Sequence, residues 1–424
     1  MTEAAPRPSV AGAPVGSPHR FPLLDGLRAI AALMVVGYHA HSPGLQLDAP
    51  AAGQSLWDGG QQLNMGVTVF FVLSGFLLYR PFAAARLAGT RAPDVPGYLV
   101  RRGLRVLPGY WVAITVFGLL LPQLVPVLVQ DWWIFYGLVQ TWVPGRMFDG
   151  LSPAWSLSVE MSFYLALPVY ALVAKRVLGR LPVRQQVRLE FGLLAAAVVG
   201  TYLARRFVFD RGDGPLGFLV WSVLGHVDWF AGGLALALAS ILWGRAEARP
   251  RWVELVERHP NRCWVAAVAL FLALGFVHGS PGDVVHVASL AAAVLLVAPA
   301  VFGGERTDPV RRALGSRPMQ WLGLVSFGIF LWNEPLASFF HHLGWDDWGL
   351  GDSGYLLFLV TAAAAIVLGA LSYYLVERPT MALGRRRSAP RVPRQVGGGE
   401  GRHRARPGAA PWSVDDISSR GGVR

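Results

Sequence analysis

Ten apolar blocks recur along this 424-residue sequence, and their length restricts the fold more than any other feature. Each block holds about 20 residues, enough for a helix to cross a hydrocarbon core of roughly 30 Å. Only 15% of the residues are charged, whereas a soluble domain has about a quarter. We therefore predict an all-α fold, a polytopic bundle of transmembrane helices. The blocks lie at about 23–41, 63–82, 106–122, 155–174, 190–204, 217–242, 263–278, 284–302, 320–340 and 355–376.

The distribution of basic residues predicts how this bundle is oriented. Arginine and lysine concentrate in the loops after every second block, those that follow 63–82, 155–174, 217–242 and 284–302. Basic loops stay in the cytoplasm, so we expect these loops and both chain termini there. An aromatic stretch at 132–142 would reverse the pattern if it crossed the membrane. We therefore expect an interfacial or re-entrant segment on the outer side, in a multi-pass protein of the plasma membrane.

Composition also predicts the domain organisation and excludes some kinds of site. We expect a disordered cytoplasmic leader at 1–20, one membrane domain at 21–380, and a disordered basic tail at 381–424. The net charge of +12 indicates orientation and contact with membrane lipids, because no basic-aromatic pattern typical of nucleic-acid binding is present. Cys263 is the single cysteine, which excludes an internal disulfide. We expect no metal site and no bound cofactor.

The first apolar block contains two ionisable residues, Arg28 and His39, which are costly inside a membrane. They are 11 residues apart, so on a helix they lie about 20° from one line and about 16 Å apart along the axis. Asp25 lies one turn below Arg28 on nearly the same face. The alternative is that Arg28 reaches the headgroups and His39 caps the helix end. The shared face favours a functional pair.

Other polar residues lie near the outer end of later blocks. Lipid exposure would be prohibitive, so they should point inward to a shared polar pocket that opens to the outer side. For Asp228 and Asn333, a structural hydrogen bond between helices is an equal alternative. The residues are Glu160, His226, Asp228, Asn333 and Glu334. Of these, His226, Asp228 and Glu334 are the candidates for an acceptor pocket.

A cluster of arginines precedes the third block on the cytoplasmic side. Arg101 and Arg102 are each about one helical turn from Arg105, so their guanidinium groups can grip one multiply charged phosphate. The alternative is the positive charge that any cytoplasmic loop carries. Arg28 lies on the same side, which favours an anionic-ligand site.

These features together resemble the membrane acyltransferase 3 family. The resemblance rests on motifs whose order and spacing extend from about residue 21 to 380. They are Leu24-Asp25-Gly26-Leu27-Arg28 with His39; Gly66-Val67-Thr68-Val69-Phe70-Phe71-Val72-Leu73-Ser74-Gly75-Phe76; Arg102 and Arg105 with Pro108 and Tyr110; Trp155-Ser156-Leu157-Ser158-Val159-Glu160 with Phe163-Tyr164; and Glu377-Arg378-Pro379.

The resemblance implies transfer of an acyl group, often acetyl, from cytoplasmic acyl-CoA to a hydroxyl of a sugar, a glycan or a natural product. It implies that His39 is the catalytic histidine and that Arg28 is an essential residue on the same helix. Arg102 and Arg105 become the donor contacts, with Arg101 beside them. We expect direct transfer with His39 as general base. Glu160 would orient either His39 or the acceptor. A covalent acyl-histidine is the less favoured route.

Two departures from the family pattern limit what can be carried over. Many members have a histidine where this chain has Asn333; an amide cannot shuttle a proton, so we assign Asn333 no catalytic role. We also expect no soluble esterase-like domain of the kind that some members append. The competing functions are a transporter or exporter of a small organic anion or glycan precursor, and an inactive scaffold. The first lacks support because no inverted repeat is visible.

Overall fold

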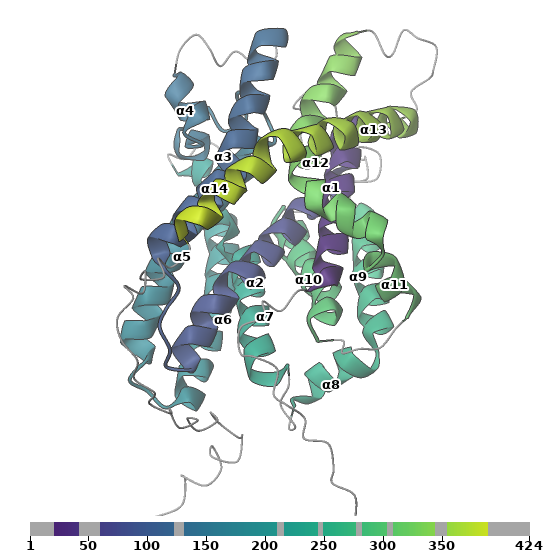
Figure 1. Ribbon diagram of the computed structural model, residues 1–424. Helices are drawn as coiled ribbons and strands as arrows, with labels where there is room; N and C mark the ends of the chain where they lie inside the picture. The colour runs from purple at the N-terminus through teal and green to yellow at the C-terminus, as the bar shows by residue number, and fades with distance from the viewer. Residues whose placement is uncertain are drawn as a thin grey trace, which may run out of the picture.

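The computed structural model describes residues 21–41, 60–122, 131–209, 216–244, 249–276, 282–302, 308–343 and 354–388. Across these ranges the regular secondary structure is helical, with no strand. The long helices form a bundle, with the short helix α4 (Trp132–Tyr136) at one end and α8 (Arg251–Arg258) at the other (Figure 1). The expected leader at 1–20 lies outside the described residues.

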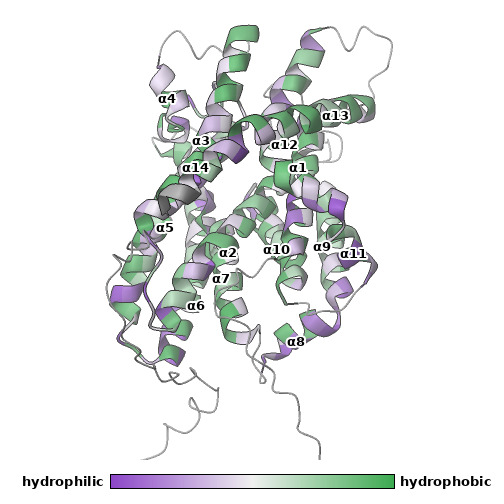
Figure 2. Ribbon diagram, in the orientation of Figure 1, coloured by the Kyte–Doolittle hydropathy of each residue, from purple (hydrophilic) through white to green (hydrophobic). Residues whose placement is uncertain are grey.

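Nine segments of the described chain are long and apolar enough to cross a membrane. Figure 2 shows that their helices are hydrophobic over most of their length. The prediction of an all-α polytopic bundle is thereby confirmed. The helices in these segments are α1 (Pro22–His41), α2 (Met65–Leu87), α3 (Val95–Leu120), α5 (Ala154–Leu178), α6 (Val183–Ala204), α7 (Val227–Trp243), α10 (Gly282–Phe302), α12 (Arg317–His342) and α13 (Gly354–Ser372).

The block expected at 263–278 corresponds to α9 (Pro260–Gly275), which has only 16 residues. At 1.5 Å per residue α9 measures about 24 Å, less than a typical hydrocarbon core. The number of crossings and the cytoplasmic placement of both termini therefore stay predictions. At 132–142 the structure has only α4 and a 3₁₀ turn at Gln140–Trp142, both far too short to span a bilayer.

Two helices depart from the expected boundaries for local reasons. Helix α3 begins at Val95 rather than near 106, because Asp94 caps it by accepting a hydrogen bond from the Gly97 backbone N–H. The three arginines expected in a loop thus lie on α3. The block at 217–242 is broken by Ser222, whose hydroxyl accepts from the Leu224 N–H. Two short 3₁₀ segments, Gly217–Trp221 and Val223–His226, precede α7.

The last helix reaches into the segment expected to be disordered from residue 381. After α13 a π-helical turn at Tyr373–Glu377 leads into α14 (Arg378–Ser388), which packs against α3 (Figure 1). The Thr380 hydroxyl donates to the Leu104 carbonyl at 3.2 Å and joins the two helices. Residues 389–424 of the expected tail lie outside the described residues.

Close backbone contacts hold α1 between α2 and α12. A methyl group on Gly323 of α12 would overlap the backbone carbonyl of Asp25 on α1. A methyl group on Gly66 of α2 would similarly overlap the carbonyl of Ala31. Small residues at such crossings let membrane helices approach closely. The polar residues of α1 therefore face these two neighbours at short range.

A buried ion pair ties α2 to α6 near the other end of α2. Glu190 is fully buried and accepts hydrogen bonds from Arg86 and from the hydroxyls of Tyr79 and Tyr170. Removing one partner of such a pair costs about 3–5 kcal/mol, because the other charge is left uncompensated. Arg86, which the charge pattern assigned to a cytoplasmic loop, is thus a structural residue of the last turn of α2.

Candidate active site

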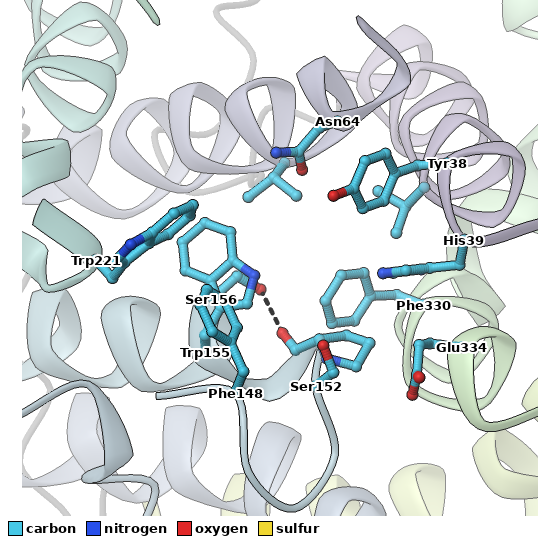
Figure 3. A pocket seen from close by; sticks show the side chains of 13 residues that line it. Tyr38, His39, Asn64, Phe148, Ser152, Trp155, Ser156, Trp221, Phe330 and Glu334 are labelled. Carbon is cyan, nitrogen blue, oxygen red and sulfur yellow. Dashed lines mark hydrogen bonds between the residues drawn. The ribbon is translucent and has the colours of Figure 1, made fainter. Parts of the chain in front are cut away.

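His39 projects from the end of α1 into a pocket that we call the histidine pocket. Figure 3 shows its imidazole between Tyr38 and Glu334, facing a wall of aromatic side chains across the cavity. Only 9% of His39 is exposed. The lining residues are Val35, Tyr38, His39, Asn64, Val67, Phe148, Ser152, Pro153, Trp155, Ser156, Trp221, Phe330 and Glu334.

The far wall of the histidine pocket consists of three packed aromatic rings. The Trp155 and Trp221 rings are 5.2 Å apart, and the Phe148 ring is 5.1 Å from that of Trp221, both pairs edge-to-face. Phe148 comes from the loop before α5, Trp155 from the first turn of α5, and Trp221 from the 3₁₀ segment before α7. Such a wall offers flat apolar faces with few polar groups.

A side chain of α12 forms a hydrogen bond with His39. Its Nδ1 lies 2.6 Å from Oδ1 of Asn333, and Asn333 is fully buried. The Asn333 amide nitrogen in turn donates to the backbone carbonyls of Phe330 at 2.5 Å and Ile329 at 3.3 Å. The sequence did not reveal this pair, because an amide within an apolar block gives no sign of which helix it faces.

Three arginines line a second pocket, which we call the arginine pocket. Arg28 comes from α1, while Arg102 and Arg105 come from one face of α3. The lining contains one carboxylate, that of Glu160. The lining residues are Arg28, Val67, Phe70, Phe71, Leu73, Ser74, Leu77, Leu78, Arg102, Arg105, Ser156, Leu157, Glu160, Tyr164, Phe327 and Phe330.

The side chains of the arginine pocket leave positive charge available to a ligand. Glu160 accepts a hydrogen bond from the Ser74 hydroxyl at 2.5 Å, and the Arg102 guanidinium lies 5.8 Å from the centre of the Tyr164 ring. The Nε of Arg28 is buried and has no hydrogen-bond partner among the described residues. A buried donor of this kind fits an anionic group in the pocket.

The two pockets meet. Val67 of α2, Ser156 of α5 and Phe330 of α12 line both of them, and we call these three residues the neck. Helix α1 passes alongside, with Arg28 in one pocket and His39 in the other. The spacing along α1 predicted from the sequence, about 16 Å, thus separates two cavities that share a boundary.

Glu160 occupies a different place from the one expected for it. The sequence suggested that it orients His39 or the acceptor, whereas the structure puts it in the arginine pocket beside Ser74. The residue in contact with His39 is Asn333. Position along a helix does not determine the neighbours of Glu160, which depend on how α5 packs against α2.

Arg101 does not line the arginine pocket. It lies against Gly97 and Gly384, where α3 meets α14. The predicted cluster of three α3 arginines therefore divides, with Arg102 and Arg105 facing the pocket and Arg101 facing the last helix.

The predicted acceptor residues also lie in different parts of the structure. Glu334 lines the histidine pocket, but His226 and Asp228 do not. Asp228 instead lies 2.9 Å from Nε2 of His286 on α10, whose ring stacks on Trp229. His286 was not predicted from the sequence, where the signal for it is a histidine within an otherwise apolar block. This cluster of His226, Asp228 and His286 is buried behind Trp155, whose ring is 5.3 Å from that of His226.

Comparison with protein families identifies the chemistry. A family model described as an acyltransferase domain, of the acyltransferase 3 type, matches residues 21–375. This match covers the helices that carry both pockets. No solved structure matches the chain.

Relatives with assigned names support the same conclusion. The chain is 27% identical to acyltransferase MdmB of Streptomyces mycarofaciens, over 88% of this chain and 95% of the relative. It is 25% identical to the putative peptidoglycan O-acetyltransferase YrhL of Bacillus subtilis and 23% identical to the peptidoglycan O-acetyltransferase OatA of Listeria monocytogenes. These matches cover 88% and 84% of this chain but only 57% and 55% of those relatives. The chain therefore belongs to the acyltransferase 3 family and is an acyltransferase.

Proposed function

We propose that this protein transfers an acyl group, with acetyl as the first candidate, from cytoplasmic acyl-CoA to a hydroxyl group. The acceptor is a sugar, an envelope glycan or lipid-linked glycan, or a glycosylated natural product. The observation that carries the proposal is the junction of an arginine pocket with a histidine pocket along α1. One elongated substrate can occupy the first pocket and present its reactive end to the second.

The arginine pocket suits the donor. Coenzyme A has a phosphate-rich end and a neutral arm that ends in the thioester. Arg102 and Arg105 offer planar guanidinium forks, which match phosphate oxygens in two-point hydrogen bonds. Arg28 lies deeper and has a buried donor free for the same ligand. The arm would then extend past the neck toward His39, over a distance comparable to its own length.

The histidine pocket suits the acceptor. Its aromatic wall can stack on the apolar face of a sugar ring, while Glu334, Asn64 and Ser152 offer hydrogen-bonding groups to hydroxyls (Figure 3). Two relatives are named for peptidoglycan, a glycan of the cell wall. This supports a carbohydrate as the acceptor class.

His39 then acts as the general base. Its neutral imidazole removes the proton from the acceptor hydroxyl while the hydroxyl oxygen attacks the thioester carbonyl carbon. The tetrahedral intermediate collapses, the carbon–sulfur bond breaks, and the new ester forms. The coenzyme A thiolate leaves and takes the proton from the His39 imidazolium. Atoms and charge balance without any further reactant.

Mass spectrometry of cells with and without the gene tests the function. Envelope saccharides and secreted glycosides should gain the mass of an acyl group only when the protein is present. In isolated membranes, radiolabelled acetyl-CoA should transfer its label to the same compound. Unchanged saccharide and glycoside masses, together with no transfer of label, would contradict the proposal.

A further inference from the structure

We propose that Asn333 is a positioning residue that holds His39 in one tautomer, with the proton on Nδ1 and the lone pair of Nε2 directed into the histidine pocket. The inference rests on the proposed role of His39 as general base. It replaces the expectation from the sequence that residue 333 takes no part in the reaction. Asn333 acts through His39 and does not itself exchange a proton with the substrate.

The orientation of the Asn333 amide follows from its surroundings. Its nitrogen faces two backbone carbonyls, those of Phe330 at 2.5 Å and Ile329 at 3.3 Å. Turning the amide over would point its oxygen at these carbonyl oxygens, where no donor is available. The side chain is fully buried, so water cannot relieve that repulsion. Oδ1 is therefore the atom that faces His39.

The tautomer of His39 follows from that orientation. An amide oxygen only accepts, so the Nδ1 that lies 2.6 Å from it must carry a proton and donate. The opposite tautomer would set two lone pairs against each other in a buried site. It would also place a proton on Nε2, which could then not accept one from a hydroxyl. Asn333 thus keeps the ring in the only neutral form that can act as a base toward the pocket.

The same contact supports the reaction after proton transfer. When Nε2 takes the proton, the ring becomes positively charged and its Nδ1–H bond to Oδ1 strengthens. An amide can provide this bond without placing a second charge in the membrane interior. The close packing of α1 on α12 at Gly323 holds the two helices that carry this pair.

Three variants test the proposal in membranes supplied with radiolabelled acetyl-CoA and their endogenous acceptor. Asn333→Leu keeps the side-chain volume but removes the acceptor; the maximal rate should fall about 100-fold, with the KM for acetyl-CoA unchanged within about threefold. Asn333→Asp, in the neutral form expected of an acid buried in the membrane, keeps a carbonyl oxygen that accepts from Nδ1 and a hydroxyl that can donate to the Phe330 carbonyl, and should recover most of the rate. Ser326→Ala is the matched control, because it removes a buried α12 hydroxyl that, among the described residues, bonds the Gly323 carbonyl of its own helix, and it should keep the full rate.

Two results would overturn the proposal. A normal maximal rate in Asn333→Leu would show that Asn333 does not orient His39, whose backbone hydrogen bond at Val35 would then suffice. A loss that Asn333→Asp does not restore, or that comes with a raised KM for acetyl-CoA, would show a packing role only. Failure of the proposed function is distinguishable, because the unaltered protein would then transfer no label, whereas failure of the His39 assignment alone would leave His39→Ala active whatever the Asn333 variants do.

Discussion

The arginine pocket and the histidine pocket share the neck, yet their linings differ in chemistry. The arginine pocket gathers three guanidinium groups against one carboxylate. The histidine pocket has one imidazole, one carboxylic acid and an aromatic wall. This difference supports the proposal that a multiply charged donor binds on one side and that a neutral, ring-shaped acceptor reacts on the other. Substitutions in each pocket should therefore change different kinetic constants.

The largest effect should come from His39→Ala. Removing the general base should lower the maximal rate by about 10²–10⁴-fold, with little change in the KM for acetyl-CoA, because the arginine pocket is intact. The rate of label transfer in membranes measures this. His41→Ala is the matched control: His41 is on the same helix, its Nδ1 bonds the Gly37 carbonyl, and it does not line the pocket. Retained activity in His39→Ala would remove the catalytic assignment.

The shared face of Arg28 and His39 was predictable from the sequence, because helical periodicity alone sets it. Most of the long helices could also be predicted, since an apolar block of about 20 residues crosses a membrane most readily as a helix. The family resemblance could be predicted from the order and spacing of its motifs. The early start of α3 was missed because a Pro/Asp capping signal stood outside the apolar block. The predictions of helix position and of shared helix faces thus used information local to one helix, whereas the family resemblance used the order of motifs along the chain.

The partners of the site residues could not be predicted in the same way. The sequence grouped Glu160 and Asn333 with His39, whereas the structure places Asn333 beside His39 and Glu160 in the arginine pocket. Only the rotation of α5 and α12 about their axes decides that Asn333 touches His39 and that Glu160 faces the arginines. That rotation is set by close contacts such as Gly323 against Asp25, which no pattern within a single helix reveals.

A smaller effect is expected from replacing both Arg102 and Arg105 by alanine. A hydrogen bond to a charged group contributes about 1.5–3 kcal/mol, so losing the two arginines should raise the KM for acetyl-CoA by at least about 10–100-fold. The maximal rate and the KM for the acceptor should change much less. Initial rates measured against acetyl-CoA concentration decide this. A raised acceptor KM with a normal donor KM would move the donor to another site.

Arg101 tests whether the donor contacts are limited to the arginines that line the arginine pocket. The sequence grouped it with the donor contacts, whereas the structure turns it toward Gly97 and Gly384. Arg101→Ala should therefore alter the KM for acetyl-CoA by less than about threefold, the size of a weak exposed charge interaction. An effect as large as that of Arg102→Ala would restore the prediction made from the sequence.

A modest effect should come from the aromatic wall of the histidine pocket. An aromatic stacking contact contributes about 0.5–1.5 kcal/mol, so Trp221→Ala should raise the KM for the saccharide acceptor by roughly 2–10-fold, whereas Trp221→Phe should nearly restore it. The donor KM should not move, because Trp221 does not line the arginine pocket. Trp133→Ala, on an exposed residue of α4, is the matched control. If Trp221→Ala instead raised the donor KM, the two pockets would not divide donor from acceptor, and the neck would lie within a single binding site.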